Sequence, residues 1–206
     1  MITLFIDTSC SDVSIAILKD NKVISKKVES IPNEHSKYAV SYVEEVLKDA
    51  NILSREVNNI MVVNGPGSFT GIRIGLTIAK IYAYLLDIKV NLISSLKTLA
   101  LSTSGEYILS IIDAKNNNCY IGLYDKEYNE IINEHFGNYD EVNDILNDYN
   151  DVIVVSNSNI NLENYKIIDL LDIENIVYYY KNKESVNAHQ VLPNYLKLPQ
   201  VMGKNV

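Results

Sequence analysis

Apolar residues in the first part of the chain form three short runs, at residues 2–7, 13–18 and 22–28, separated by polar turns. Runs of this length, rich in Val and Ile and bounded by Ser, Asp and Asn, predict β-strands. Because the two intervening turns are short, we expect the three strands to pair antiparallel in sequence order.

The apolar spacing then changes to that of helices. Tyr38, Tyr42 and Val46 fall on one helical face. A strand at 60–63, a helix from about 71 to 86, a strand at 90–93 and a short helix ending near Leu101 follow. The predicted order is βββαβαβα, in which the strand–helix–strand crossovers favour parallel pairing beside the antiparallel strands.

A second unit begins near Tyr107, with strands predicted at 107–112, 120–124 and 152–155 and a helix at 139–146. The tyrosine-rich run before Lys181 fits either a strand or a helix. No linker rich in Pro, Gly or Ser separates the two halves. We therefore expect an α/β protein with an N-terminal lobe (residues 1–104) and a smaller C-terminal lobe (residues 105–206) that share an interface.

Charge is distributed unevenly along the 206 residues. The net charge is -8, and residues 1–100 carry 11 basic and 10 acidic side chains, whereas residues 101–206 carry 7 and 16. Because phosphate contacts need clustered Lys and Arg, this balance argues against a protein that grips nucleic acid over its whole surface. Two cysteines, an N-terminus without a basic signal region and no apolar run near ~20 residues predict a cytoplasmic protein without a membrane span.

The most specific segment is GPGSFTGIRIG at residues 65–75, between a predicted strand and a predicted helix. Glycine permits close approach of a backbone or an anion, and Ser68 or Thr70 can cap the helix. The loop lacks the Lys-Ser/Thr ending of a Walker loop. It is either a tight structural turn or a contact for an anion or a partner, and both interpretations stay open.

Two further groups of residues carry candidate chemistry. Phe69 either anchors in its own core or is presented to a partner. Arg73 could bind a phosphate or a partner carboxylate, or could simply be a solvated surface charge. Asp7 and Thr8 leave the first strand at a turn, where they could face a phosphate or bond only to their own backbone. The three histidines and two cysteines lack metal-ligand spacing, so no metal site is expected.

Several of these segments together resemble the TsaB (YeaZ) family of bacterial tRNA threonylcarbamoyladenosine biosynthesis proteins. The 65–75 segment is the most specific, and the matches run in order almost to the C-terminus. They are Ile6-Asp7-Thr8-Ser9, His35-Ser36, residues 65–75, Ala79-Lys80, Ser94-Ser95-Leu96, Ile112-Asp113-Ala114 and Pro193-Asn194-Tyr195-Leu196.

The resemblance implies the actin-like ATPase fold (the ribonuclease H-like fold of Hsp70, actin and sugar kinases), with two βββαβαβα lobes, the second abbreviated. It also implies a role in N6-threonylcarbamoyladenosine (t6A) formation at position 37 of tRNA. Members of this family pair with the transferase TsaD, which the ATPase TsaE joins. TsaD carries a metal-binding His pair where this chain has Ser95 and Leu99, and Leu99 cannot bind metal. We therefore expect a non-catalytic subunit.

The resemblance also assigns residues. We expect a homodimer in the absence of TsaD, and tRNA contacts made mainly through the complex. Candidate cofactor residues are Asp7, Thr8 and Gly67, with no intrinsic cofactor and ATP or ADP possible only at the complex interface. The expected partner interface comprises His35, Tyr38, Tyr42, Ser68, Phe69, Thr70, Gly71 and Arg73.

Three alternatives remain open. The tyrosines could face their own sheet rather than a partner. The protein could be a small ATPase or kinase of the same fold, although the C-terminal half lacks clustered glycines for an adenosine site. A metalloprotease is disfavoured by the missing ligand spacing.

Overall fold

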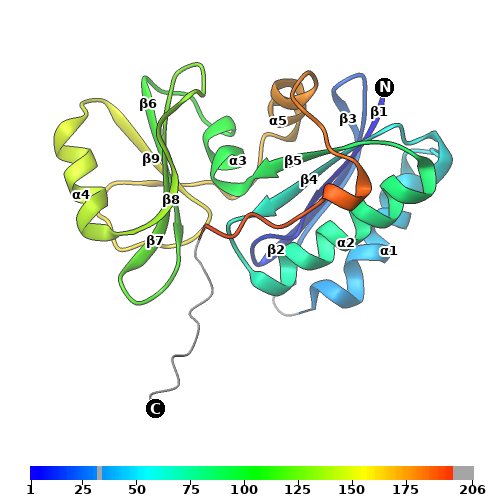
Figure 1. Cartoon of the computed structure of the whole chain (residues 1–206), viewed down its shortest axis with the longest axis horizontal. Helices are drawn as coiled ribbons and strands as arrows, with labels where there is room; N and C mark the ends of the chain where they lie inside the picture. The colour runs from blue at the N-terminus through cyan, green and yellow to red at the C-terminus, as the bar shows by residue number, and fades with distance from the viewer. Residues whose placement is uncertain (32–33, 197–206) are drawn as a thin grey trace, which may run out of the picture.

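The computed structural model describes residues 1–31 and 34–196, which form two lobes side by side (Figure 1). The first lobe is built from the N-terminal half of the chain. Its elements are β1 (Ile2–Asp7), β2 (Asp12–Lys19), β3 (Lys22–Ser30), α1 (His35–Asp49), a 3-10 turn (Ser54–Glu56), β4 (Asn59–Gly65), α2 (Phe69–Leu86), β5 (Val90–Ser94) and α3 (Ser95–Leu101).

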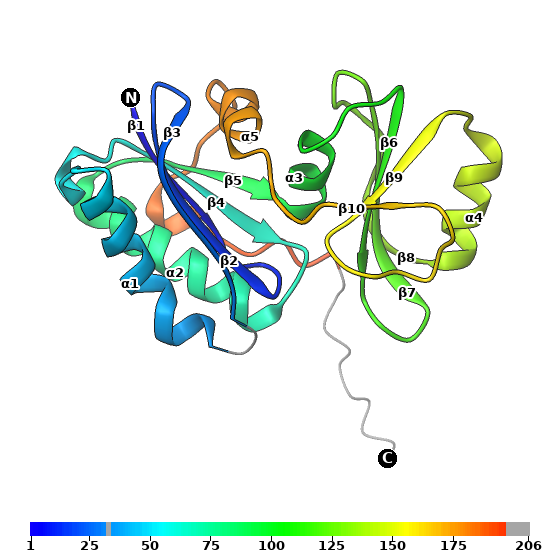
Figure 2. The same ribbon diagram turned by 180° about the vertical axis from the view of Figure 1, so that it is seen from behind.

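The first sheet has the strand order β3-β2-β1-β4-β5. β1 pairs antiparallel with β2, and β2 with β3, as the two short turns predict. β4 pairs parallel with β1 and with β5, as the crossovers predict. Both faces of this sheet are covered, since α1 and α2 pack on one side and a later helix packs on the other (Figures 1 and 2).

The second sheet repeats this pattern, with the order β10-β9-β6-β7-β8. β6, β7 and β8 pair antiparallel, and β9 pairs parallel with β6 and β10. The elements are β6 (Tyr107–Asp113), β7 (Asn118–Asp125), β8 (Glu130–Asn138), α4 (Tyr139–Asp148), β9 (Val152–Ser156) and β10 (Lys166–Ile167). β8 and β10 were not predicted, because β8 is largely polar and β10 is two residues long.

The duplicated topology establishes the two-lobe actin-like arrangement, and the second copy is the shorter. In the first lobe α2 connects β4 to β5, whereas the described residues between β9 and β10 contain no helix. The second sheet therefore carries α4 on its outer face and lacks a counterpart of α2 (Figure 1). This confirms the expected fold class and the abbreviation of the second lobe.

The chain returns to the first lobe after β10. Ile173, Ile176 and Val177 of α5 (Ile173–Tyr180) are buried against β1, β2 and β4. Further on, Val186 bridges to Val90, and a second 3-10 turn, Ala188–Gln190, packs beside α2. The sequence-based boundary assigned all of residues 105–206 to the second lobe, whereas residues from Ile173 onward pack against the first.

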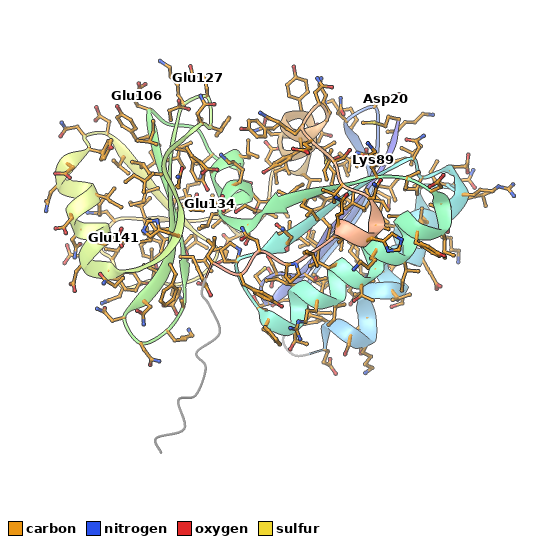
Figure 3. All side chains as sticks on the ribbon, viewed as in Figure 1. Asp20, Lys89, Glu106, Glu127, Glu134 and Glu141 are labelled. Atoms are coloured by element: carbon orange, nitrogen blue, oxygen red, sulfur yellow. The ribbon has the colours of Figure 1, made fainter. Side chains whose placement is uncertain are left out.

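A buried polar network joins the lobes. Glu134 of β8, labelled in Figure 3, accepts hydrogen bonds from Ser94 Oγ at 2.6 Å and Tyr124 Oη at 2.8 Å. Lys97 of α3 donates to the Tyr128 carbonyl at 2.7 Å and lies 4.0 Å from the Tyr124 ring centre. Burial raises the pKa of Glu134, and the bonds from Ser94 and Tyr124 partly offset this. The lobes are thus coupled through ionisable groups as well as apolar contacts.

Helix α2 is unusually apolar. Its 18 residues are long and apolar enough to cross a membrane by length and composition alone. In the structure it lies on the first sheet and buries Ile72, Ile78 and Ala83 among others. Core helices of soluble proteins pass the same test, so this is weak support for a membrane span.

Candidate functional site

The loop between β4 and α2 lies directly against the turn between β1 and β2. Ser68 N donates to the Ser9 carbonyl at 2.7 Å, and Ser68 Oγ caps α2 by accepting from Gly71 N at 3.2 Å. A Cβ at Gly67 or Gly71 would collide with the carbonyl oxygens of Ser9 and Thr8. Gly67 also has φ +155, within the region that favours glycine. These glycines therefore allow two backbone segments to touch.

The predicted cofactor residues Asp7, Thr8 and Gly67 lie together, but most of their polar groups are already used. Thr8 Oγ1 donates to the Gly71 carbonyl at 2.7 Å and accepts from Gly75 N at 3.1 Å. Asp7 is buried and accepts from Ser9 N at 2.8 Å. Burial raises the pKa of Asp7. Internal packing accounts for Thr8 and Gly67, and a cofactor role stays a prediction.

A cleft of about 800 Å³ opens beside this loop, between the two lobes. It is formed by the β1–β2 turn, the starts of α1 and α2, the β6–β7 hairpin and the end of β9. Its lining is mostly small and hydroxyl-bearing: Ser9, Cys10, Ser11, His35, Ser36, Gly67, Ser68, Thr70, Gly71, Ile74, Ile112, Asp113, Ala114, Lys115, Tyr120, Asn157 and Ser158.

His35, Cys10 and Lys115 are the lining residues with the most reactive side chains, and each is held or deactivated by its surroundings. His35 is buried, and its Nε2 lies 2.8 Å from the Cys10 carbonyl oxygen. Burial raises the pKa of the Cys10 thiol to about 12, so it is protonated and a poor nucleophile at neutral pH. Lys115 pairs with Asp113 at 2.8 Å. Among the described lining residues, exposed Ser11 donates from Oγ to Asp12 Oδ1 at 3.2 Å, whereas neither His35 nor Lys115 is hydrogen-bonded to a hydroxyl or a thiol.

The two positions at which the family resemblance places metal ligands in the transferase are structural in this chain. Ser95 Oγ donates to the Pro66 carbonyl, and Leu99 is buried against the second sheet. In residues 1–31 and 34–196, no group of three or more His, Cys, Asp or Glu is arranged to hold a metal ion.

The residues expected at a partner interface divide into buried and exposed sets. Tyr42 is 7% exposed and donates to Glu29 Oε2 at 2.6 Å, so it faces its own sheet, the alternative left open above. Tyr38 is half-buried and stacks on Tyr42 at 5.8 Å. His35 and Gly71 are buried, and Ser68 is exposed but bonded within the loop. The exposed set comprises Phe69, Thr70 and Arg73.

Several exposed apolar side chains on and near α2 were not singled out from the sequence. Ile81, Tyr84 and Leu85 are 51%, 67% and 73% exposed, and Leu192 of the returning segment is 61% exposed. The sequence of α2 did carry a signal for them. A surface helix normally has polar residues opposite its core face, whereas α2 has a second stripe of apolar residues there.

Tyr195 was also missed as a site residue. Its ring stacks on Phe69 at 5.7 Å, and its hydroxyl accepts from Arg73 Nε at 2.9 Å. The guanidinium carbon of Arg73 lies 3.6 Å from the Phe69 ring centre. No local pattern could predict that Tyr195 joins this cluster, because it is 122 residues from Arg73.

Comparisons with known proteins agree with the residue resemblance. Residues 22–170 match the family described as "TsaD: tRNA N6-adenosine threonylcarbamoyltransferase". The chain is 28% identical to the tRNA threonylcarbamoyladenosine biosynthesis protein TsaB of Bacillus subtilis, over 99% of this chain and 97% of that relative. It is 30% identical to TsaB of Escherichia coli over an alignment that covers 62% of this chain and 57% of that relative.

A solved structure shows the same fold. YeaZ from Pseudomonas aeruginosa superimposes with a TM-score of 0.79 at 24% identity, covering 95% of this chain and 99% of that one. At 24% identity this likeness establishes the fold alone. Membership of the family rests on the sequence match over residues 22–170.

Proposed function

Since the chain belongs to the tRNA N6-adenosine threonylcarbamoyltransferase (TsaD) family, and within it to the TsaB (YeaZ) group that takes part in t6A biosynthesis, we propose that it is a non-catalytic subunit supporting TsaD. In this proposal the chain binds TsaD, and TsaE joins the pair. It works in the cytoplasm and leaves the transfer of the threonylcarbamoyl group to TsaD.

The observation that carries this proposal is the exposed apolar face of α2. Ile81, Tyr84 and Leu85 project from it, and Val40 of α1 is also 55% exposed. Burying such residues against a partner contributes about 25 cal/mol per Å² of apolar area. Apolar patches of this kind on a soluble protein typically mark an interaction surface.

The engaged side chains of the cleft support a non-catalytic role. Catalysis of acyl transfer needs an activated nucleophile or a polarising group placed beside the substrate. Here the Cys10 thiol is protonated at neutral pH, His35 is bonded to a backbone carbonyl, and Ser95 and Leu99 hold the fold together.

The acidic second half supports the proposal that tRNA is bound mainly by the other subunits. Residues 101–206 carry 16 acidic and 7 basic side chains. This half would be repelled by the phosphate backbone, so tRNA is held mainly by the other subunits of the complex. In the absence of TsaD, the same apolar face makes a homodimer. No cofactor belongs to this chain alone, and ATP or ADP binds only at the complex interface.

A second candidate function rests on the interlobe cleft. Its volume of about 800 Å³ would admit a nucleotide, which is the feature that a small ATPase or kinase of this fold would need. The internal bonds of Thr8 Oγ1 oppose this reading, because that hydroxyl has no free hydrogen to offer a phosphate. Steady ATP turnover by the purified chain alone would favour the enzyme.

The proposed function is tested in the host by removing the gene and measuring t6A in total tRNA by mass spectrometry. We expect t6A to fall to near zero and to return with the wild-type gene. Restoration by a Cys10→Ser variant is expected as well, since the thiol has no catalytic task. Normal t6A without the gene would rule out the proposed function.

A further inference from the structure

Arg73 is held in one orientation by two aromatic side chains. Its guanidinium carbon lies 3.6 Å from the Phe69 ring centre, and its Nε donates to Tyr195 Oη at 2.9 Å. The two rings stack on each other with an interplanar angle of 23°. The side chain has therefore lost much of its rotamer freedom before any partner arrives, which lowers the entropic cost of binding.

Most of the hydrogen-bonding capacity of this arginine is unused within the described part of the chain. A guanidinium has five N–H donors, and the bond to Tyr195 occupies one. Among residues 1–31 and 34–196, Nη1 and Nη2 make no hydrogen bond and Arg73 forms no ion pair. The side chain is exposed, so its planar fork faces solvent at the start of the apolar face.

The charges of α2 indicate what this fork would bind. Between Phe69 and Leu86 the helix contains Arg73 and Lys80 but no Asp or Glu. Two copies of the chain meeting α2 to α2 would bring cations together without a carboxylate from either helix. A different protein that carries an acid on an apolar surface complements this face better.

Resting on the proposed function, we infer that Tyr195 is a positioning residue that fixes Arg73 to receive a carboxylate of TsaD. Phe69 and Tyr195 hold the guanidinium, and the free fork forms a bidentate ion pair with an Asp or Glu of the partner. The returning C-terminal segment thus completes a binding surface that α1 and α2 do not form alone.

The inference is tested by titrating full-length chain into purified TsaD of the same host by calorimetry. Arg73→Gln removes the charge and is expected to weaken binding at least ~10-fold, as for a lost charge-assisted pair. Tyr195→Phe keeps the stacked ring but frees Nε, and is expected to weaken binding about 3-fold or more. In the Arg73→Gln background, Tyr195→Phe is expected to have no further effect.

Arg55→Gln is the matched control, because Arg55 is the only other arginine of the chain and lies in the exposed turn before β4. It should bind TsaD as the wild type does. An equal loss from Tyr195→Phe in both backgrounds would show that Tyr195 does not act through Arg73 and would overturn the inference.

Three other outcomes bear on this inference, and the first two separate it from the proposed function. Wild-type affinity for Arg73→Gln, with the wild-type chain binding TsaD, would refute the carboxylate contact and leave the pairing intact. No binding of wild-type chain to TsaD would remove the proposed function and this inference together. If sedimentation showed that Arg73→Gln weakens a homodimer by the same factor, the carboxylate would belong to a second copy, and the inference would be wrong.

Discussion

At the scale of single residues, the glycines of the 65–75 loop act through backbone contact. Gly67 and Gly71 leave no room for a side chain against the carbonyls of Ser9 and Thr8. The sequence left a structural turn and an anion or partner site both open. The contacts show why the glycines are required for packing, while Phe69 and Arg73 of the same segment point outward. One motif therefore combines a folding constraint with an exposed surface.

Substitution of Gly71 tests this packing. Gly71→Ala should lower the free energy of unfolding by about 1–3 kcal/mol, because its Cβ would meet a backbone carbonyl that cannot move aside. Gly105→Ala is the control, since its Cβ would meet the flexible end of Ile153 instead. Urea titration of both variants measures the difference. Equal stability of Gly71→Ala and the wild type would mean that the loop does not need this contact.

At the scale of elements, apolar periodicity predicted most of the first lobe and less of the second. β1, β2, β4 and β5 are mostly buried, so their sequences are largely apolar even though Thr3, Ser14 and Asn91 interrupt them. β8 is an edge strand whose residues are mostly half-exposed, and its polar sequence gives no such signal. α5 was ambiguous because its three tyrosines suit strand or helix, and its burial depends on the first sheet, which is distant in sequence.

The polar network between β8 and α3 predicts that the free energy of unfolding depends on pH through Glu134. Burial raises the folded-state pKa of Glu134, so the folded protein binds this proton more tightly than the unfolded chain does. Stability from this group is therefore present at low pH and is lost as the pH rises through the folded pKa.

Glu134→Gln isolates this effect, because Gln keeps the shape and one acceptor for Ser94 or Tyr124 but does not titrate. From pH 4 upwards, the free energy of unfolding of the wild type should fall relative to that of the variant, by at most about 1.4 kcal/mol per pH unit. Urea titrations at each pH give both values. Parallel curves for the two proteins would show that folding does not raise the pKa of Glu134.

At the scale of the whole molecule, the two lobes differ in chemistry and the C-terminal segment links them. The first lobe is nearly neutral and carries the loop, the apolar face and Arg73, whereas the second half carries the acidic excess. The lobes themselves could be predicted from the sequence, because their strand order follows from local patterns. The return of residues 173–196 to the first lobe could not, since it depends on contacts of α5 with β1, β2 and β4 and of the following residues with α2 and β5.

This arrangement implies that pairing depends on the first lobe and not on the second. Leu85 is 73% exposed on α2, and Ile131 is 43% exposed on β8 of the second lobe. A Glu at either position should leave the monomer folded, because surface substitutions usually change stability by less than about 0.5 kcal/mol. Only the charge on α2 should oppose the burial of this face against TsaD.

The most direct test is analytical ultracentrifugation of TsaD mixed with the wild-type chain, with Leu85→Glu or with Ile131→Glu. The proposed function predicts a complex with the wild type and with Ile131→Glu, and separate sedimentation of TsaD and Leu85→Glu. A complex of undiminished affinity with Leu85→Glu, or its loss with Ile131→Glu, would contradict the assignment of the partner surface to α2.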